Sequence, residues 1–319
     1  MSEQLPSVTV IIPSRPDLPD VQAVTAARAL DYPADRLEIL LARGKQPSVQ
    51  RNTALRAARG ELIYFLDDDS LALPGNVRRA VEHFCDPKVQ MVGGPNLCPA
   101  GAPLLEQVFA LVLASWLAFG PSRARYAKVG AVRATSEKEL ILCNLLARRE
   151  TLLKHGGFNE ALYPNEENAL MDNIQQEGGK LLYDPELLVW RRPRRTLGAF
   201  ARMLRTYGRG RAEQFRETPT LGSALNFVPP LFLVYLLAVV PMASFLGLFA
   251  FVPLALYALA VLLQVLALMP SGGVVRGLWA LPLIVLTHVL YGFGFWFGLF
   301  TKLKPPGERS KVPVTLEKI

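Results

Sequence analysis

The sequence predicts an α/β fold, with a Rossmann-like, mostly parallel sheet, helices on both faces, and C-terminal transmembrane helices after it. Two observations support this fold class. In residues 1–190, short apolar runs alternate with stretches of helical spacing, as in β-α-β units with parallel strands. Residues 226–300 carry one charged side chain, Arg276, over a length that suits about three membrane-crossing helices.

Composition favours a membrane-associated protein over a nucleic-acid-binding one. The formal net charge is +8, and nine arginines lie in residues 191–216, directly before the apolar part. Such a cluster suits anionic lipid headgroups, and no nucleic-acid motif accompanies it. The three cysteines, Cys85, Cys98 and Cys143, lack zinc-binding spacing, so we expect a reducing cytosolic setting for the globular part. We expect no signal peptide, because no basic and then apolar leader opens the sequence.

The globular part divides into strands and helices at identifiable stop signals. Pro13 ends the first strand, Tyr32-Pro33 ends the first helix, and Gly60 ends the second helix. The predicted strands are residues 8–13, 37–41, 62–66, 140–146 and 180–185, and residues 89–95 are expected to form a strand and a glycine turn. The predicted helices are residues 20–31, 49–59, 76–84, 150–155 and 169–177.

The apolar run 62–66 leads directly into three carboxylates, Asp67, Asp68 and Asp69. Open α/β sheets bind ligands just beyond the carboxyl ends of their strands. Carboxylates placed there can hold a hard divalent cation, which in turn can bridge a diphosphate. The alternative is that Asp69 or Ser70 caps the following helix while the other carboxylates are solvated.

Two further segments are expected to meet a membrane surface. Residues 103–119 are strongly apolar but short for a span, so we expect an interfacial helix or one buried against the C-terminal helices. An ordinary core helix is the alternative. Residues 191–225 should form an Arg-rich amphipathic segment on the cytoplasmic membrane face, where arginine can also grip phosphate. Here the alternative is a solvated basic helix.

The transmembrane part is expected at residues 226–301, with segments near 227–248, 250–269 and 278–300. A basic C-terminal tail, residues 302–319, follows, and its lysines and arginines favour the cytoplasmic side. Three spans would put this tail opposite the globular domain. The sequence leaves open whether one segment is re-entrant.

Several segments, taken in order, resemble family 2 inverting glycosyltransferases, whose catalytic domain has the GT-A fold. The matching segments are Val8 to Pro13, Gln50-Arg51-Asn52, the DxD motif Asp67-Asp68-Asp69, Gly156-Gly157-Phe158 and Glu166-Glu167. The resemblance covers about residues 7–216 and implies a GT-A catalytic domain at residues 1–190. The Arg-rich and apolar segments are similar to membrane-bound members that make lipid-linked glycans or exopolysaccharide, such as the succinoglycan-type transferases.

The resemblance implies a role for each matching residue. Asp69 and Asp67 would bind Mn²⁺ or Mg²⁺, and Glu167, or Glu166 beside it, would be the general base. The implied nucleotide-sugar-binding residues are Pro13, Ser14, Arg15, Arg51, Asn52, Asp67, Asp68 and Gly94. Arg209 and Arg211 would meet the diphosphate or a lipid phosphate. The implied donor is a nucleotide sugar, a UDP-sugar in the first place, and the acceptor is a lipid-linked or polyprenyl-phosphate molecule.

The chain departs from the family pattern at several places. The aspartate usual after the second strand is replaced by Ala42-Arg43-Gly44-Lys45, and the acidic pair is Glu-Glu instead of Glu-Asp. The Gln-x-x-Arg-Trp motif of processive synthases is absent. Its absence favours an enzyme that adds a single sugar.

The sequence therefore predicts a metal-dependent inverting glycosyltransferase of cell-surface or exopolysaccharide biosynthesis. We expect it in the inner (cytoplasmic) membrane, multi-pass, with the catalytic domain in the cytoplasm. A polyprenyl-phosphate glycosyltransferase is the alternative within this class, and its anionic acceptor would need little base. A catalytically inactive nucleotide-binding scaffold is the alternative of another class. A transporter is disfavoured, because the spans are few and no inverted repeat is visible.

Overall fold

The computed structural model describes residues 5–162, 164–217, 219, 221–303 and 312–319. The chain forms two compact units. The first consists of Met1–Pro99, Ala124–Arg192 and Lys304–Ile319, and the second of Ala100–Arg123 and Pro193–Leu303.

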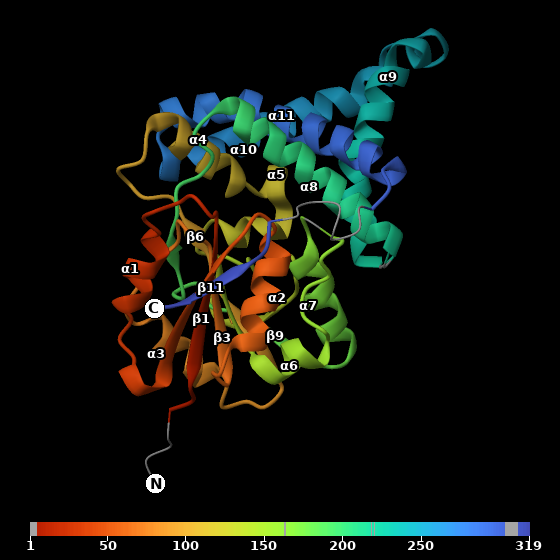
Figure 1. Cartoon of the computed structure of the whole chain (residues 1–319). Coiled ribbons are helices and arrows are strands. Elements are labelled where there is room, and N and C mark those ends of the chain that lie inside the picture. Colours follow the sequence, from red (N-terminus) through yellow and green to blue (C-terminus); the bar gives the residue numbers. More distant parts are fainter. Residues whose placement is uncertain (1–4, 163, 218, 220, 304–311) are drawn as a thin grey trace. The chain divides into compact units, whose positions relative to one another are not determined.

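A mixed sheet forms the centre of the first unit, and Figure 1 shows its strands. Within the described residues the order is β11-β2-β1-β3-β8-β5-β9-β7. The strands are β1 (Val8–Ser14), β2 (Leu37–Arg43), β3 (Leu62–Leu66), β5 (Val89–Gly93), β7 (Arg133–Thr135), β8 (Asn144–Arg148), β9 (Lys180–Tyr183) and β11 (Thr315–Lys318). Strands β1, β2 and β3 pair in parallel, as do β5 and β9, whereas β8 runs antiparallel between β3 and β5. The expected α/β fold is confirmed, but the sheet is mixed rather than mostly parallel, because β7, β8 and β11 each run antiparallel to the strands they pair with.

Helices cover both faces of this sheet, as the sequence predicts. They are α1 (Gln22–Arg28), the 3₁₀ turn η1 (Ala34–Arg36), α2 (Pro47–Ala57), α3 (Asn76–His83), α6 (Arg149–Lys154) and α7 (Glu166–Gln176). Helices α1 and α3 contribute to one apolar core, while α2, α6 and α7 contribute to the other (Figure 1). Alternate strand residues feed the two cores, with Tyr64 in one and Phe65 in the other, because successive side chains of a strand point to opposite faces.

A small second sheet begins with the residues that follow the three aspartates Asp67–Asp69. It contains β4 (Leu71–Ala72), β6 (Asn96–Leu97) and β10 (Val189–Trp190). Strand β10 pairs antiparallel with β4, so Trp190 is opposite Leu71. This pairing places Val189 and Trp190 beside Leu71 and Ala72, which follow Asp67–Asp69 closely in the chain.

The C-terminal segment differs from the expected basic tail. Residues 315–318 form β11, which pairs antiparallel with β2 at the edge of the main sheet. Glu317 contacts Arg43 at 2.5 Å, and Lys318 contacts Glu38 at 2.9 Å. Sequence patterning missed this strand because it is short, exposed and separated from its partner by most of the chain.

The second unit is helical. It contains α4 (Leu104–Leu113), α5 (Trp116–Phe119), the start of η2 (Gly120–Arg125), α8 (Leu197–Glu217), η3 (Leu221–Phe227), α9 (Val228–Leu246), η4 (Gly247–Phe251), α10 (Val252–Gly272) and α11 (Val274–Phe300). The single helix expected over 103–119 is broken at Ser115, whose side chain accepts a hydrogen bond from Ala118 N and caps α5. The apolar face of the Arg-rich helix α8 is covered by protein, with Phe200 stacked on Phe109 at 4.2 Å.

Helices α8 and α11 pack closely because glycines line their contact. A Cβ atom on Gly208 would lie 2.0 Å from the carbonyl oxygen of Tyr291, and one on Gly294 would lie 2.0 Å from that of Arg205. These approaches leave no room for a methyl group. The two helices therefore depend on glycine for their separation.

Two runs of the described residues are long and apolar enough to cross a membrane, Ser223–Gly272 and Val274–Phe300. The number rises to three if the bent pair Leu104–Leu113 and Trp116–Arg125, at 62°, counts as one span. The three segments expected from the sequence thus fall into two runs. The first run holds both α9 and α10, joined by η4 at Gly247, which has a φ of 57°.

The return of the chain to the first unit constrains how often it can cross a membrane. The chain leaves this unit after Arg192 and rejoins its sheet at β11. A chain that leaves and rejoins a unit on one side of a membrane crosses that membrane an even number of times. We therefore expect residues 193–303 to cross twice, and residues 100–123, which are too few for two crossings of about 20 residues each, to turn back. The number of crossings and the side of the C-terminal segment stay predictions.

We expect tags on the two ends of the chain to lie on the same side of the membrane. In sealed vesicles, both should show the same protease sensitivity, and the exposed native Cys85 should react with an impermeant maleimide on that side. A cysteine introduced at Gly273, between the two apolar runs, should react from the opposite side. Tags of opposite accessibility would contradict the even number of crossings.

We expect Gly208→Ala to destabilise the second unit by about 1–3 kcal/mol, because the added methyl group forces α8 and α11 apart. The matched control is Gly198→Ala on the same helix, where a Cβ meets nothing within 4 Å. Thermal unfolding of the purified proteins in detergent should show a lower Tm for Gly208→Ala and no loss for the control. Equal Tm values would show that the helices absorb the methyl group without cost.

Candidate active site

The three aspartates, Asp67, Asp68 and Asp69, form a tight turn at the carboxyl end of β3, which we call the acidic turn. Ser70 N donates to the Asp67 carbonyl at 3.0 Å, and the Ser70 hydroxyl donates to the Cys143 carbonyl at 3.2 Å. The following helix, α3, begins at Asn76 after Gly75 and has no side-chain cap. The alternative that Asp69 or Ser70 caps this helix is therefore wrong. Burial, together with the charges of Asp69 and Asp67, raises the pKa of Asp68.

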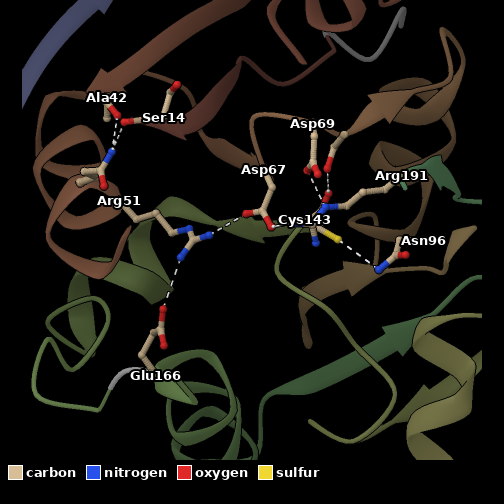
Figure 2. A network of polar contacts seen from close by, with 11 residues as sticks. Ser14, Ala42, Arg51, Asp67, Asp69, Asn96, Cys143, Glu166 and Arg191 are labelled. Carbon is tan, nitrogen blue, oxygen red and sulfur yellow. Dashed lines mark hydrogen bonds and ion pairs between the residues drawn. The ribbon is translucent and has the colours of Figure 1, made fainter. Parts of the chain in front are cut away.

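Arg51 joins the acidic turn to the Glu-Glu pair, as Figure 2 shows. It projects from α2 and donates to Asp67 Oδ1 at 2.8 Å and to Glu166 Oε1 at 3.3 Å. Its side chain is 7% exposed, and that of Glu166 is 3% exposed. A buried guanidinium thus gathers carboxylates from two segments almost 100 residues apart in the chain.

Arg191 provides a second cation for the acidic turn. Its Nε lies 2.5 Å from Asp69 Oδ1, and its Nη2 lies 3.1 Å from Asp67 Oδ2 (Figure 2). Burial acts to lower the pKa of Arg191, but the charges of Asp67, Cys143 and Asp69 hold it well above its ordinary value. The sequence placed Arg191 in the basic cluster and gave no signal of this pairing, because the residues are 122 positions apart.

The geometry of Asp67 and Asp69 fits a divalent cation. Both carboxylates direct an oxygen at the same guanidinium, so they converge on one cationic position. Carboxylate oxygens are ligands that Mg²⁺ and Mn²⁺ accept. Across the part of the chain that the structure describes, no group of three or more His, Cys, Asp or Glu side chains is arranged to hold a metal. The protein thus offers two carboxylates, and further ligands would have to come from a bound molecule or water.

The two glutamates have different surroundings at the start of α7. The sequence predicted a helix from residue 169, but α7 begins at Glu166, so both glutamates lie in its first turn. Asn165 precedes them at a φ of 117°, the one positive φ of a non-glycine residue in the described chain. Glu166 is buried and accepts from Asn165 N at 3.0 Å, whereas Glu167 is partly exposed. Burial and the charge of Glu167 raise the pKa of Glu166 to about 7, against the effect of Arg51.

Asn52 holds the loop that leads to α7. Its side chain donates to the Phe158 carbonyl at 2.8 Å and to Glu160 at 2.9 Å, and accepts from Phe158 N at 2.8 Å. Gly157 makes this contact possible, because a Cβ there would lie 2.4 Å from the Asn52 Oδ1. The side-chain amide of Asn52 is thus bonded within the protein, and its part in nucleotide-sugar binding stays a prediction.

The other residues expected at the nucleotide sugar lie at two strand ends of the same sheet. Pro13 and Ser14 are buried at the end of β1, where the Ser14 carbonyl accepts from Gln50 at 2.8 Å, and Arg15 is exposed just beyond. Gly94 follows β5, and a Cβ there would lie 1.9 Å from the Leu187 carbonyl. The close approach that requires glycine at this position is therefore to the chain's own backbone.

Arg209 and Arg211 belong to α8 in the second unit. Arg209 pairs with Glu213 at 3.3 Å, and Arg211 donates to Gln214 at 3.2 Å. Their contact with a phosphate stays a prediction.

Arg43 joins the C-terminal strand to the loop after β1, and the sequence did not predict these contacts. Arg43, besides its pair with Glu317 on β11, donates to the Leu18 carbonyl at 2.7 Å. The loop that follows Arg15 is thus fixed to the C-terminal strand. Arg43 belongs to the segment Ala42-Arg43-Gly44-Lys45, which replaces the aspartate that the resemblance leads us to expect, and here its side chain is bonded within the protein.

Comparison with known proteins relates this site to sugar transfer. The model of the family described as "Glycosyl transferase family group 2" matches residues 62–298, a stretch that begins at β3 and ends in α11. The pre-mycofactocin glycosyltransferase of two strains of Mycobacterium tuberculosis is 29% identical over 149 residues. That match covers 46% of this chain and 30% of the relative, so the chain spans less than a third of the length of these relatives.

A solved structure shares the fold. The mannosyltransferase PcManGT from Pyrobaculum calidifontis, described in complex with GDP-Man and Mn²⁺, aligns with a TM-score of 0.58 at 20% identity. The alignment covers 88% of this chain and 87% of that protein. At this identity the likeness shows the fold, which is the GT-A fold expected from the sequence.

We expect the stability of the protein to depend on pH through Glu166. Its folded-state pKa of about 7 lies above the ordinary value of 4.5. Its contribution to the free energy of unfolding is therefore fully present below pH 4.5 and is lost as the pH rises through 7. Glu166→Gln stays neutral and should escape this loss. The Tm of the wild type should therefore fall relative to that of Glu166→Gln between pH 5 and pH 8.

The matched control for this measurement is Glu82→Gln, which removes an exposed carboxylate on α3. The difference between this control and the wild type should hardly change with pH. If the Tm difference between Glu166→Gln and the wild type is equally independent of pH, the raised pKa of Glu166 is contradicted.

Proposed function

This chain belongs to glycosyl transferase family group 2 and is a GT-A glycosyltransferase, and we propose that it moves a sugar from a nucleotide-sugar donor to a lipid-linked acceptor with inversion. The observation that supports this most is Arg51. It draws Asp67 of the acidic turn and Glu166 of the glutamate pair to one place in the first unit. Inverting transfer needs these two features together, a site for the leaving diphosphate and a base for the acceptor.

We assign the general base to Glu167 and a positioning role to Glu166. Glu167 is partly exposed and can meet an acceptor hydroxyl, whereas Glu166 is buried and bonded to Arg51 and Asn165. Glu167 would take the hydroxyl proton while the acceptor oxygen attacks the anomeric carbon and the bond to the diphosphate breaks. The charge of Arg51 holds the start of α7 and the acidic turn in place during this displacement.

The donor site is proposed at the acidic turn. Asp69 and Asp67 would hold Mn²⁺ or Mg²⁺, which when bound neutralises charge on the leaving diphosphate. Pro13, Ser14 and Arg15 would border the nucleotide base at the end of β1. The solved mannosyltransferase is described with GDP-Man and Mn²⁺, so GDP stands beside UDP among the nucleotides to test.

The proposed acceptor is lipid-linked, in exopolysaccharide or cell-surface glycan synthesis. Two apolar runs that could cross a membrane support it, as do arginines of residues 191–216. Those exposed in the second unit are Arg194, Arg195, Arg202, Arg205 and Arg216. Such a cluster beside apolar helices favours anionic headgroups and the cytoplasmic face of an inner membrane. Arg209 and Arg211 are proposed to meet a phosphate of the donor or the lipid.

We expect calorimetry with UDP, GDP, dTDP and CMP to find one nucleoside diphosphate or monophosphate that binds the detergent-purified protein in an Mn²⁺-dependent way. Asp69→Asn should weaken this binding at least about tenfold, because it removes a charged metal ligand. The matched control is Asp35→Asn, an exposed aspartate before β2, which should bind as the wild type does. Metal-dependent binding that survives Asp69→Asn would refute the donor site, and no nucleotide binding at all would favour the inactive scaffold.

In the same preparation, Glu167→Gln should keep nucleotide binding and lose at least about 10²-fold in sugar transfer, since a positioned base contributes roughly this factor. The result also separates two acceptors. A polyprenyl phosphate is already ionised, so substantial transfer by Glu167→Gln would indicate a polyprenyl-phosphate glycosyltransferase.

A further inference from the structure

We propose that Arg191 is a built-in counter-ion of the Asp67–Asp69 pair, which leaves the carboxylates when a divalent cation binds and turns to the diphosphate of the donor. The proposal rests on the function proposed above and adds a residue that neither the motifs nor the family match assigns. It starts from the observation that one guanidinium bridges both expected metal ligands, at 2.5 Å from Asp69 and 3.1 Å from Asp67.

The backbone places Arg191 at the acidic turn. Strand β10 pairs with β4 directly after that turn, with Trp190 opposite Leu71. Arg191 N also donates to the Leu97 carbonyl at 2.9 Å, which continues the pairing of β10 with β6. Its Cα is thus fixed beside the carboxyl end of β3, while its long side chain has several rotatable bonds and is 22% exposed. The position is a consequence of strand pairing and does not depend on one rotamer.

A divalent cation and the Arg191 guanidinium cannot both occupy the point where the two carboxylates converge. Asp69 Oδ1 and Asp67 Oδ2 hold the guanidinium, and the same two carboxylates would hold the cation, whose like charge repels the guanidinium at such short range. Asp68 is the third carboxylate of this turn, but in the described residues no group of three or more Asp, Glu, His or Cys side chains is arranged to hold the cation elsewhere. Binding of the metal must therefore displace the guanidinium.

Arg51 does not compete in the same way. It contacts the other oxygen of Asp67, Oδ1, and is anchored at its far side by Glu166, with 7% of its side chain exposed. Arg191 is 22% exposed, and in the described chain its ion pairs are with Asp67 and Asp69 of the acidic turn. The two arginines thus have separate roles, with Arg51 fixed and Arg191 able to move.

The displaced guanidinium needs a new anion, and a diphosphate bound to the same cation would supply one. Arginine binds phosphate oxygens through two parallel N–H donors, which suits this exchange. Metal and diphosphate should then bind cooperatively, because metal alone must break the Arg191 contacts without replacing them. Without donor, Arg191 keeps the acidic turn neutralised and ordered.

The test is Mn²⁺ binding to the full-length, detergent-purified protein, followed by electron paramagnetic resonance with and without the nucleotide that calorimetry identifies. In Arg191→Gln, Mn²⁺ alone should bind about tenfold tighter, because the competing cation is gone. The affinity for the nucleotide in saturating Mn²⁺ should fall by about the same factor, because a diphosphate contact is lost. Arg191→Lys keeps the charge but cannot bridge two carboxylates. Its affinities for Mn²⁺ and for the nucleotide should therefore lie between those of the wild type and Arg191→Gln.

Arg194→Gln is the matched control, since it removes one exposed arginine from the same segment and should leave Mn²⁺ binding unchanged. Thermal unfolding of each variant establishes that it is folded. Mn²⁺ binding by Arg191→Gln that is no tighter than in the wild type would overturn this proposal while leaving the proposed function in place. Failure of the wild type to bind Mn²⁺ even with nucleotide would overturn both.

Discussion

The ion pairs of Arg51 are the interaction on which the site depends. A guanidinium 7% exposed contacts Asp67 from the end of β3 and Glu166 from the start of α7. Breaking a buried pair of this kind by removing one partner typically costs about 3–5 kcal/mol, because the remaining charge stays buried and unpaired. The distance between the acidic turn and the glutamate pair is therefore fixed by electrostatics as well as by the sheet. Asn52, the next residue on α2, holds the intervening loop through Phe158 and Glu160.

The surroundings of the carboxylates explain their different chemical characters. Glu166 is buried beside a second carboxylate and has a pKa raised to about 7, while Glu167 is partly exposed. At the acidic turn, Asp67 gives one oxygen to Arg51 and the other to Arg191. Cations therefore alternate with carboxylates from Asp69 to Glu166. Such an arrangement lets a protein concentrate negative charge at one sheet edge without unfolding it.

Local patterning succeeded where each element carries its own signal. Strands β1, β2 and β3 are short apolar runs with a proline or glycine nearby, and the carboxylates follow β3 directly. It failed where a neighbour distant in sequence decides the structure. The strand expected at residues 140–146 is shifted to 144–148, because the pairing of Leu66 with Asn144 sets where β8 begins. Strand β11 exists because β2 offers an unpaired edge, and its own four residues carry almost no strand signal.

The sequence by itself determined the fold class, the acidic turn, the Glu-Glu pair and the apolar C-terminal part, because hydrophobic periodicity and short motifs are local properties of the chain. Tertiary structure alone decided which charges meet. The partners Asp69 and Arg191, Arg51 and Glu166, and Arg43 and Glu317 lie far apart in the chain and are joined by strand pairing and helix packing. Their spacing in sequence carries no information about contact, since a sheet brings together strand ends irrespective of the length of the connections.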